Sequence, residues 1–485
     1  MITRNLLKLA RKTQPLHTRR IVQATQAAFG AKNETSAHDP DPVSKSYIDS
    51  NPFMKYTALA NQTGSLNLGQ GFPDYETQPI VQKANQEALK AGHAAHLPTN
   101  AEGLPEFKEK FAKVVSKRLN RTLNPDDNLF TSHGGAGTHS TFLTTFLEEG
   151  DEVILFEPFF LWHPVSEVLG YVPKISYFKY CEKNQRLMID EEHLRSLVTP
   201  KTKVITIINP NNPDGKGWTR EELEVLRQIC LENPQIMIIS DEVYNLFIFD
   251  DNEHIPIASL PDMFERTVTI YSVGKEMSCT GWRLGVGVGP DHLIKPAQEK
   301  TRWSLMGCAS NIQLAGLHAY NQADDPYLGE VDYWTYKKKD YQQRRDRIVS
   351  VVEEATKLKL DVIPAQGGYT FNCYIVDEIW RVPVKYFYLE REIPEGVTEA
   401  DLPELSEEGG IVRFEDWKKI PGVELSPDQA FGQWFARDIG VTIVPGSYLF
   451  YNRGKELFDK VGVDVVRFSV CKDHGNFDKL EELLN

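Results

Sequence analysis

The sequence predicts an α/β fold in which helices cover both faces of a mostly parallel sheet. Short apolar runs rich in β-branched residues recur along the chain without alternating apolar and polar positions, a pattern typical of strands buried on both faces. These runs are residues 153–156, 204–208, 236–240 and 267–271. Helix-length segments separate them, such as 219–232, which opens with the capping pattern Thr219-Arg220-Glu221-Glu222. This succession of strands and helices favours βαβ units.

The chain is long enough for one large domain with smaller parts built around it. Single cores stop growing at roughly 250–300 residues, and this chain has 485. We expect an N-terminal arm at 34–78 that contributes to a small domain, a large domain at 79–326 and a smaller α+β domain at 327–485. The last contains a long charged segment at 336–357 that predicts a helix, and a Pro-, Glu- and Asp-rich stretch at 377–427 that predicts an acidic surface insertion.

Composition argues against several classes of function. The formal charge of -14 gives a surface that would repel nucleic-acid backbones. The sequence has no apolar stretch long enough to span a bilayer. Its six cysteines form no CxxC pair, which argues against both a disulfide framework and a metal cluster. We therefore expect no nucleic-acid partner, no membrane span and no metal site.

The first 33 residues differ from the rest of the chain. They contain seven basic residues and neither Asp nor Glu, with Leu6, Leu7 and Leu9 between the first basic positions. An amphipathic, acid-poor leader of this kind is typical of a mitochondrial transit peptide, so we expect residues 1–33 to direct the protein to the matrix. A basic arm on a cytoplasmic protein is the alternative.

A lysine follows one of the predicted strands. Ser272-Val273-Gly274-Lys275 comes at the end of the run 267–271. A buried lysine has a lowered pKa, which suits its amine to Schiff-base formation with an aldehyde. The structural alternative is an ordinary lysine that reaches solvent at the end of a strand.

Polar side chains follow two other predicted strands. Asp241 and Tyr244 come directly after the run 236–240, at the carboxyl edge of the sheet where ligands bind. A carboxylate there can keep a pyridine nitrogen protonated, while a phenol can bind a ring oxygen. Alternatively, Asp241 caps a helix. Asn212 follows the run 204–208 and precedes a proline, which favours an extended backbone that presents its amide.

A glycine-rich turn completes the set of candidate ligand-binding segments. Ser132-His133-Gly134-Gly135-Ala136-Gly137-Thr138 precedes a predicted helix. Backbone amides at the start of a helix bind phosphate, although glycine-rich turns are also common without any ligand.

Together these motifs resemble the fold-type I aminotransferases that use pyridoxal 5'-phosphate (PLP), in particular the group of kynurenine aminotransferase, glutamine transaminase K and cysteine-S-conjugate β-lyase. The resemblance extends from about Asn51 to the C-terminus and includes five ordered motifs. They are Asn67 to Asp74, Gly150 to Ile154 with Glu157 to Phe160, the Asn211-Asn212-Pro213 turn, Ser240 to Tyr244, and Ser272 to Lys275 with Thr280 to Arg283. The resemblance implies a large domain with a mostly parallel seven-stranded sheet, and a homodimer.

The resemblance also implies a role for each matching residue. Lys275 would form the Schiff base with PLP and carry the substrate proton, and Asp241 would face the pyridine nitrogen. Asn212 and Tyr244 would hold the ring oxygen. The phosphate would bind Ser272, Arg283 and the amides of Gly135 and Ala136, with Phe160 stacked on the ring. The substrate would contact Gly71, Arg467, Asn212 and Phe53.

The sequence departs from the family pattern at two places. Relatives often carry a tyrosine for the partner's phosphate site where this chain has Pro98. Phe53 and Ala136 stand where some relatives have tryptophan and tyrosine, so the substrate pocket is expected to differ.

The expected reaction is transamination by a ping-pong mechanism. L-Kynurenine is the leading donor, with glutamine, aromatic or sulfur-containing amino acids as others, and 2-oxoglutarate or another 2-oxo acid as acceptor. Arg302 is the one further arginine considered for a side-chain carboxylate, and it could equally be a surface residue.

Three alternatives stay open at this stage. The first is a PLP-dependent lyase, either a cysteine-conjugate β-lyase or a relative of aminocyclopropane-carboxylate synthase. The second is an NAD-type oxidoreductase that uses the glycine run 285–289, although this run lacks the GxGxxG spacing. The third is a PLP-binding protein without catalysis.

Overall fold

A computed structural model describes residues 52–91, 102–160, 162–181, 183, 186–375, 378, 381–388, 425–451 and 464–485. The expected transit peptide, Pro98 and most of the acidic insertion lie outside these residues. The chain divides into two compact units, Met1–Lys55 and Tyr56–Asn485. In the first, only the start of helix α4 (Pro52–Thr63) is described. The domain boundaries expected at 78/79 and 326/327 stay predictions.

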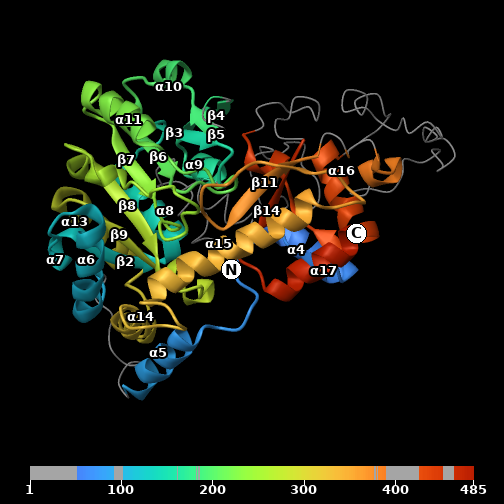
Figure 1. Cartoon of the computed structure of the whole chain (residues 1–485). Helices are drawn as coiled ribbons and strands as arrows, with labels where there is room; N and C mark the ends of the chain where they lie inside the picture. The colour runs from blue at the N-terminus through green and yellow to red at the C-terminus, as the bar shows by residue number, and fades with distance from the viewer. Residues whose placement is uncertain are drawn as a thin grey trace, which may run out of the picture. The chain divides into compact units, whose positions relative to one another are not determined.

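A mostly parallel sheet forms the centre of the second unit (Figure 1). Its order is β2-β9-β8-β7-β6-β3-β4-β5. The strands are β2 (Leu129–His133), β3 (Glu152–Glu157), β4 (Val172–Cys181), β5 (Arg186–Ile189), β6 (Thr202–Ile208), β7 (Met237–Asp241), β8 (Thr267–Ser272) and β9 (Leu284–Val288). Strands β8, β7, β6, β3 and β4 are parallel, whereas β9 runs against both of its neighbours. The predicted α/β architecture is therefore confirmed, but the sheet has eight strands rather than the expected seven, because the short β5 extends it by an antiparallel hairpin onto β4.

The predicted strands are buried on both faces. In β6, Val204 and Ile208 pack into one hydrophobic cluster, while Ile205 and Ile207 pack into another on the opposite face. This explains why the run 204–208 shows no alternation. Helix α11 (Arg220–Glu232) covers the second face and begins with the predicted capping box between Thr219 and Glu222.

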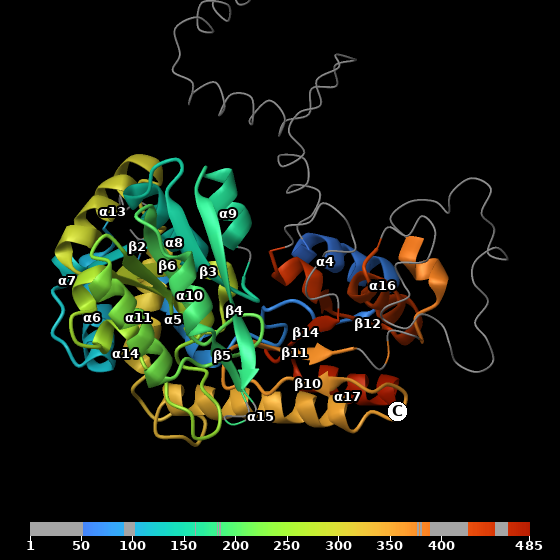
Figure 2. The same cartoon turned by 90° about the horizontal axis from the view of Figure 1, so that it is seen from above.

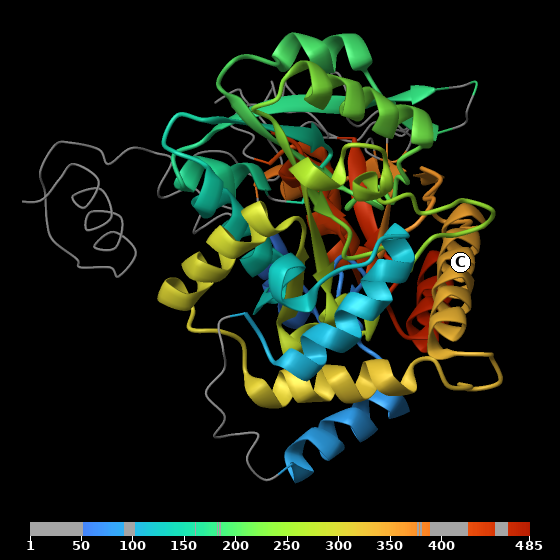
Figure 3. The same ribbon diagram turned by 90° about the vertical axis from the view of Figure 1, so that its left-hand side faces the viewer.

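Further helices surround the sheet. They are α5 (Pro79–Lys90), α6 (Pro105–Leu119), α7 (Pro125–Asn128), α8 (Gly134–Phe146), α9 (Trp162–Val168), α10 (Glu191–Leu197), α12 (Val273–Glu276), α13 (Asp291–Ser304) and α14 (Ser310–Gln322). Figure 3 shows α5, drawn in blue, packed against the yellow α14. Among the described helices, none is long and apolar enough to cross a bilayer.

A second, smaller sheet follows in the chain. Its order is β10 (Asp361–Val362), β11 (Thr370–Tyr374), β14 (Val465–Ser469) and β13 (Val444–Pro445), all antiparallel. The long helix α15 (Tyr333–Glu353) lies beside α17 (His474–Leu484), as Figure 2 shows, and α16 (Pro427–Trp434) packs near β13 and β14. The expected helix at 336–357 is thus present, shifted by three to four residues towards the N-terminus.

A short two-stranded sheet joins the segment after α4 to this part of the fold. Strand β1 (Leu66–Asn67) pairs in parallel with β12 (Val441–Thr442). The chain then passes β14, where the Ser469 amide donates to the Leu68 carbonyl at 2.7 Å. Gly69 lies so close to Ile443 that an added Cβ would be 2.7 Å from its backbone carbon. The segment from Gly69 to Tyr75 is therefore held against the second sheet.

Candidate active site

A cavity of about 170 Å³ lies at the carboxyl edge of the large sheet. Parallel strands β6, β7 and β8 end there with Ile208, Asp241 and Ser272, and this edge is where α/β sheets bind ligands. Every residue predicted to bind a cofactor lines the cavity: Gly135, Ala136, Phe160, Asn212, Asp241, Tyr244, Ser272, Lys275 and Arg283. Residues from five separate motifs are therefore brought together around one cavity.

Lys275 lies on the single-turn helix α12 that follows β8. Its Nζ donates a hydrogen bond to the Gly71 carbonyl at 2.8 Å and lies 5.3 Å from the Tyr244 ring centroid and 4.8 Å from that of Tyr369. Burial lowers the pKa of this amine to about 8, while the nearby Cys471 acts in the opposite direction. At pH 7 about a tenth of Lys275 is thus an uncharged nucleophile, far more than for a solvated lysine at the end of a strand.

Asp241 is the last residue of β7 and is 5% exposed. Its Oδ1 accepts a long hydrogen bond of 3.3 Å from the Val243 amide, and the residues that follow form turns, so Asp241 caps no helix. Burial raises the pKa of this carboxyl to about 7, against the opposing effects of the Val243 amide and Lys275. A cationic ring nitrogen in the cavity would provide the partner that a buried carboxylate requires.

Asn212 connects three predicted site residues. Its Nδ2 donates to the Tyr244 hydroxyl at 3.3 Å, and its Oδ1 accepts from Arg467 Nη1 at 3.3 Å. Arg467 on β14 is 1% exposed and also donates to the Gly69 carbonyl. Burial lowers the pKa of this guanidinium to about 10. The site therefore contains a buried cation in a fixed orientation, which is suited to a carboxylate ligand.

The turn that carries Asn212 is fixed by its own side chains. Asp214 Oδ1 accepts hydrogen bonds from Asn211 Nδ2 at 3.0 Å and from the Lys216 amide at 2.9 Å. Gly215 has a φ of +71°, and a Cβ there would lie 2.5 Å from the Ala365 Cβ. The backbone therefore presents Asn212 in one orientation.

The other end of the cavity is suited to an anion. The 13-residue helix α8 begins at Gly134, so the amides of Gly135 and Ala136 lie in its first turn. Gly134 has a φ of +72°, and a Cβ there would lie 2.7 Å from Arg283 Nη2. A guanidinium, the buried Ser272 at the end of β8 and a helix N-terminus thus surround the same space.

The sequence did not reveal every residue around the cavity. Trp162, Ile208 and Val243 also line it, and the Trp162 ring stacks on His139 at a centroid distance of 3.9 Å. Tyr369 was missed as well, although its hydroxyl donates to the Lys275 carbonyl at 2.7 Å. Position alone could have suggested Trp162, because it follows Phe160 just past the end of β3.

Three predicted residues do not line the cavity: Arg467, which contacts Asn212, and also Gly71 and Phe53. Gly71 joins the site through its hydrogen bond to Lys275. Phe53 lies in the first turn of α4, within the first unit, so its contact with the substrate stays a prediction.

Arg302 and the glycine run 285–289, which the sequence offered for other ligands, both have structural roles. Arg302 is exposed and pairs with Glu102 and Glu299, away from the cavity lining. The glycine run 285–289 forms β9 and the residue after it; a Cβ on Gly287 would lie 2.3 Å from the Phe130 ring. These glycines make room for a packed aromatic side chain rather than opening a dinucleotide-binding helix.

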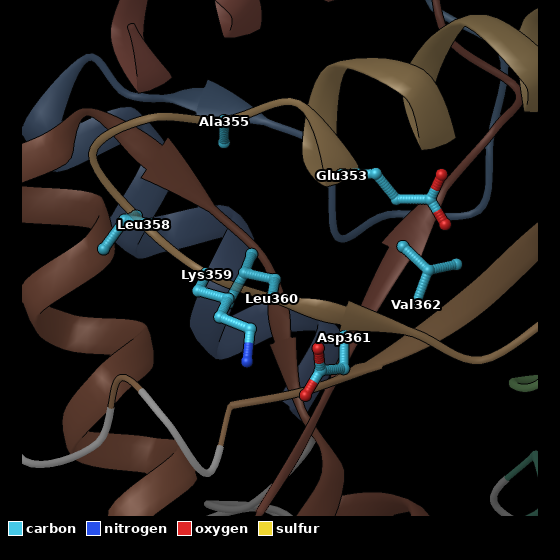
Figure 4. A pocket seen from close by; sticks show the side chains of 7 residues that line it. All are labelled: Glu353, Ala355, Leu358, Lys359, Leu360, Asp361 and Val362. Atoms are coloured by element: carbon cyan, nitrogen blue, oxygen red, sulfur yellow. The ribbon is translucent and has the colours of Figure 1, made fainter.

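A second cavity, of about 290 Å³, lies where α15 ends and β10 begins (Figure 4). Its charged lining residues are Glu353, Lys359 and Asp361. None of the predicted site residues lines it.

Comparisons with known proteins agree with this geometry. The model of the family "Aminotransferase class I and II" matches residues 63–374. Human kynurenine–oxoglutarate transaminase 1 is 28% identical over 446 residues, which cover 90% of this chain and 96% of that protein. Human kynurenine–oxoglutarate transaminase 3 is also 28% identical, covering 90% of this chain and 88% of that protein.

Solved structures show the same fold. Bna3p from Saccharomyces cerevisiae aligns with a TM-score of 0.73 at 25% identity, covering 93% of this chain and 98% of that one. The N-succinyldiaminopimelate aminotransferase of Mycobacterium tuberculosis aligns with a TM-score of 0.73 at 23% identity, covering 92% and 99% of the two chains.

Proposed function

The chain belongs to the class I and II aminotransferases, and on that premise we propose that it binds PLP at Lys275 and moves the amino group of an amino acid to a 2-oxo acid. One observation carries the proposal. A lysine with a lowered pKa and a carboxyl with a raised pKa face the same cavity, beside an anion site. When bound, PLP supplies an aldehyde that joins amines and a ring that accepts electrons from the substrate α-carbon.

The residues present fit this cofactor. Asp241 would face the pyridine nitrogen, which explains a buried carboxyl with so little hydrogen bonding from the protein. Asn212 and Tyr244 would hold the ring oxygen, and Phe160 would stack on the ring. The phosphate would bind Ser272, Arg283 and the amides of Gly135 and Ala136.

Lys275 is the group that moves the proton. Once the substrate amine takes its place, the Nζ is free beside the substrate and, with a pKa near 8, can accept the α-proton close to neutral pH. The Gly71 carbonyl then accepts a hydrogen bond from the resulting ammonium. The same Nζ can return this proton to complete the transfer.

Arg467 would hold the substrate. Its guanidinium is positioned by Asn212 and Gly69 and is buried, so it can bind the substrate α-carboxylate through a bidentate pair. Among the residues that line the cavity, Arg283 is the only arginine, and it belongs to the anion end. We therefore favour donors with neutral side chains. L-Kynurenine leads, supported by the human relatives, with glutamine, aromatic and sulfur-containing amino acids as further donors and 2-oxoglutarate as acceptor.

Assembly and location are part of the proposal. A homodimer is supported by Trp303 and Met306, which are 80% and 78% exposed near the end of α13.

Mitochondrial import rests on the basic, acid-free N-terminus. Fusing residues 1–33 to a reporter tests it: mitochondrial fluorescence supports import, and a diffuse cytoplasmic signal contradicts it.

The deciding experiment is the visible spectrum of the purified protein with PLP, before and after addition of L-kynurenine without any 2-oxo acid. Wild type should show the band of lysine-bound cofactor, and kynurenine should bleach it with release of a 2-oxo acid. Lys275→Ala should not turn over, whereas Lys295→Ala, at an exposed lysine paired with Asp127, should behave as wild type. Absence of the band in wild type contradicts the proposal. Release of a β-substituent from a cysteine conjugate would reveal lyase activity.

A further inference from the structure

A cluster of hydroxyl groups lies beside Lys275, outside the lining of the cavity. We call Tyr75, Ser278, Tyr341 and Tyr369 the hydroxyl cluster. The Tyr75 hydroxyl donates to Ser278 Oγ at 3.0 Å and lies 3.0 Å from the Tyr341 hydroxyl, which in turn is 3.1 Å from Ser278 Oγ. Each of these three hydroxyls can therefore donate one bond and accept another, which closes a ring.

The hydrogen bond between Lys275 and Gly71 has a counterpart a few residues later in both segments. Ser278 lies three residues after Lys275, and Tyr75 lies four residues after Gly71. The hydrogen bond from Lys275 Nζ to the Gly71 carbonyl is thus accompanied by the one from Tyr75 to Ser278. The two segments are held together at two successive points.

Tyr369 joins the cluster to Lys275 itself. Its hydroxyl donates to the Lys275 carbonyl at 2.7 Å, and its ring lies 4.8 Å from the Lys275 Nζ. The Tyr369 ring also stacks on Tyr341, with centroids 4.8 Å apart. One side chain therefore contacts both the backbone and the amine of this lysine.

The backbone at Ser278 indicates that the cluster imposes its geometry. Ser278 has a φ of +51°, a left-handed conformation that costs a residue with a Cβ free energy and persists where the surroundings enforce it. Its hydroxyl bonds to Tyr75 and Tyr341 and the bond from its amide to the Lys275 carbonyl at 3.1 Å hold it there. They define where the turn after α12 ends, and so where Lys275 lies.

A second buried lysine anchors the cluster. Lys337 of α15 is fully buried, and its Nζ donates to the Tyr75 hydroxyl at 3.0 Å and lies 3.5 Å from Asp340. Burial lowers the pKa of this amine to about 8. Lys337 Nζ also lies 4.6 Å from the Tyr341 ring, much as Lys275 lies over Tyr369.

We propose that the hydroxyl cluster, anchored by Lys337, is a positioning device that keeps Lys275 Nζ against the Gly71 carbonyl while the free amine carries the substrate proton. This rests on the proposed function, because it concerns the step in which the proton leaves the α-carbon for Nζ and later returns. The cluster residues act through Lys275 and are positioning residues.

The test uses Tyr75→Phe and Tyr341→Phe, which remove only the hydroxyls. With an α-deuterated donor, both variants should show a larger kinetic isotope effect than wild type and a kcat lower by about threefold to tenfold, because proton transfer becomes slower. The donor KM should stay within about twofold, since Arg467 is untouched. Tyr171→Phe is the matched control: this buried tyrosine donates to the Leu143 carbonyl, away from the cluster.

A second readout needs no turnover. Full-length protein purified without PLP is labelled with acetic anhydride across a pH series, and modification of Lys275 is followed by mass spectrometry. A weakened bond to Gly71 should lower the midpoint from about 8 by about half a pKa unit in both cluster variants, and not in Tyr171→Phe.

The outcomes separate the two proposals. If wild type fails to transaminate, the proposed function fails while the labelling still tests the positioning. If both cluster variants match Tyr171→Phe in isotope effect and labelling midpoint, the cluster only supports the fold and the inference is overturned. Should Tyr75→Phe not fold, Tyr341→Phe decides alone.

Discussion

Arg118 and Glu276 form a bidentate ion pair, with Nη1 to Oε1 at 2.7 Å and Nη2 to Oε2 at 3.1 Å. Glu276 directly follows Lys275 and its side chain is fully buried, while Asn245 and Tyr320 also donate to it. The pair ties α6 to the short helix that carries the lysine. Although burial opposes ionisation, Arg118 and these donors hold the pKa of Glu276 below its ordinary value, so it stays charged.

Replacing Arg118 by Met should destabilise the protein by about 3–5 kcal/mol, because it leaves an uncompensated buried carboxylate. Chemical unfolding measures the loss. Arg347→Met is the control: this arginine pairs with Asp478 and Glu481 at the surface, so its loss should cost about 1 kcal/mol or less. Equal losses in the two variants would contradict the buried role of Arg118.

Glu242 should make stability fall as pH rises. Burial raises its pKa from 4.5 to about 8, against the opposing bond from Ser240, so the folded state retains a proton that the unfolded chain loses above its ordinary pKa. Stability is therefore highest below that ordinary pKa and declines up to about pH 8. Glu242→Gln should remove this decline and be more stable than wild type at pH 8 by on the order of 4 kcal/mol. Unfolding at pH 5 and pH 8 checks it, and a gain that is larger at pH 5 would refute it.

Asp241→Asn should lose activity without losing stability. Burial already raises the pKa of this carboxyl to about 7, so a neutral side chain of the same shape fits the folded protein at least as well. The loss of the charge facing the cofactor nitrogen should lower the rate of the half-reaction by on the order of 10²–10³-fold. Stopped-flow absorbance and thermal unfolding are the two measurements. An active variant would exclude the assigned role of Asp241.

Gly134→Ala should weaken cofactor binding specifically. The new Cβ would lie 2.7 Å from Arg283 Nη2 and would displace the guanidinium from the anion site. We expect the Kd for PLP to rise at least about tenfold. Gly150→Ala provides the control, because Gly150 has an equally unusual φ of +91° but nothing within 4 Å of an added Cβ. Both variants should lose about 1 kcal/mol of stability, and only the first should lose PLP affinity.

The residues that could be predicted from sequence are those whose position in the chain fixes their position in space. Lys275, Asp241 and Asn212 each follow a buried strand of one parallel sheet, so their meeting at its edge follows from the fold class. Tyr369 and Lys337 could not be found in this way. They come from later segments with no distinctive spacing, and only the tertiary packing brings Tyr369 beside Lys275 and Lys337 beside Tyr75.

The same distinction applies to the secondary structure. The sequence predicted a helix at 336–357, but Asp332 caps it earlier by accepting from the Thr335 amide at 2.7 Å. It ends at Glu353, and soon afterwards the Thr356 and Lys357 amides bond to Asn485 and Leu484 at the chain's end. Contacts that remote in sequence have no local signature. The hairpin to β5 likewise depends on an edge of the sheet being available.

Because Gly69 has no side chain, its backbone can lie directly against that of Ile443. Any larger residue there must push the segment away from Ile443 and carry its carbonyl away from Arg467. A variant with a larger residue at this position would then lose substrate recognition while keeping every chemically active group. Such a lesion would resemble a catalytic defect in an assay, and no side-chain substitution at position 443 would suppress it, because the added Cβ meets backbone atoms of Ile443 and Val444.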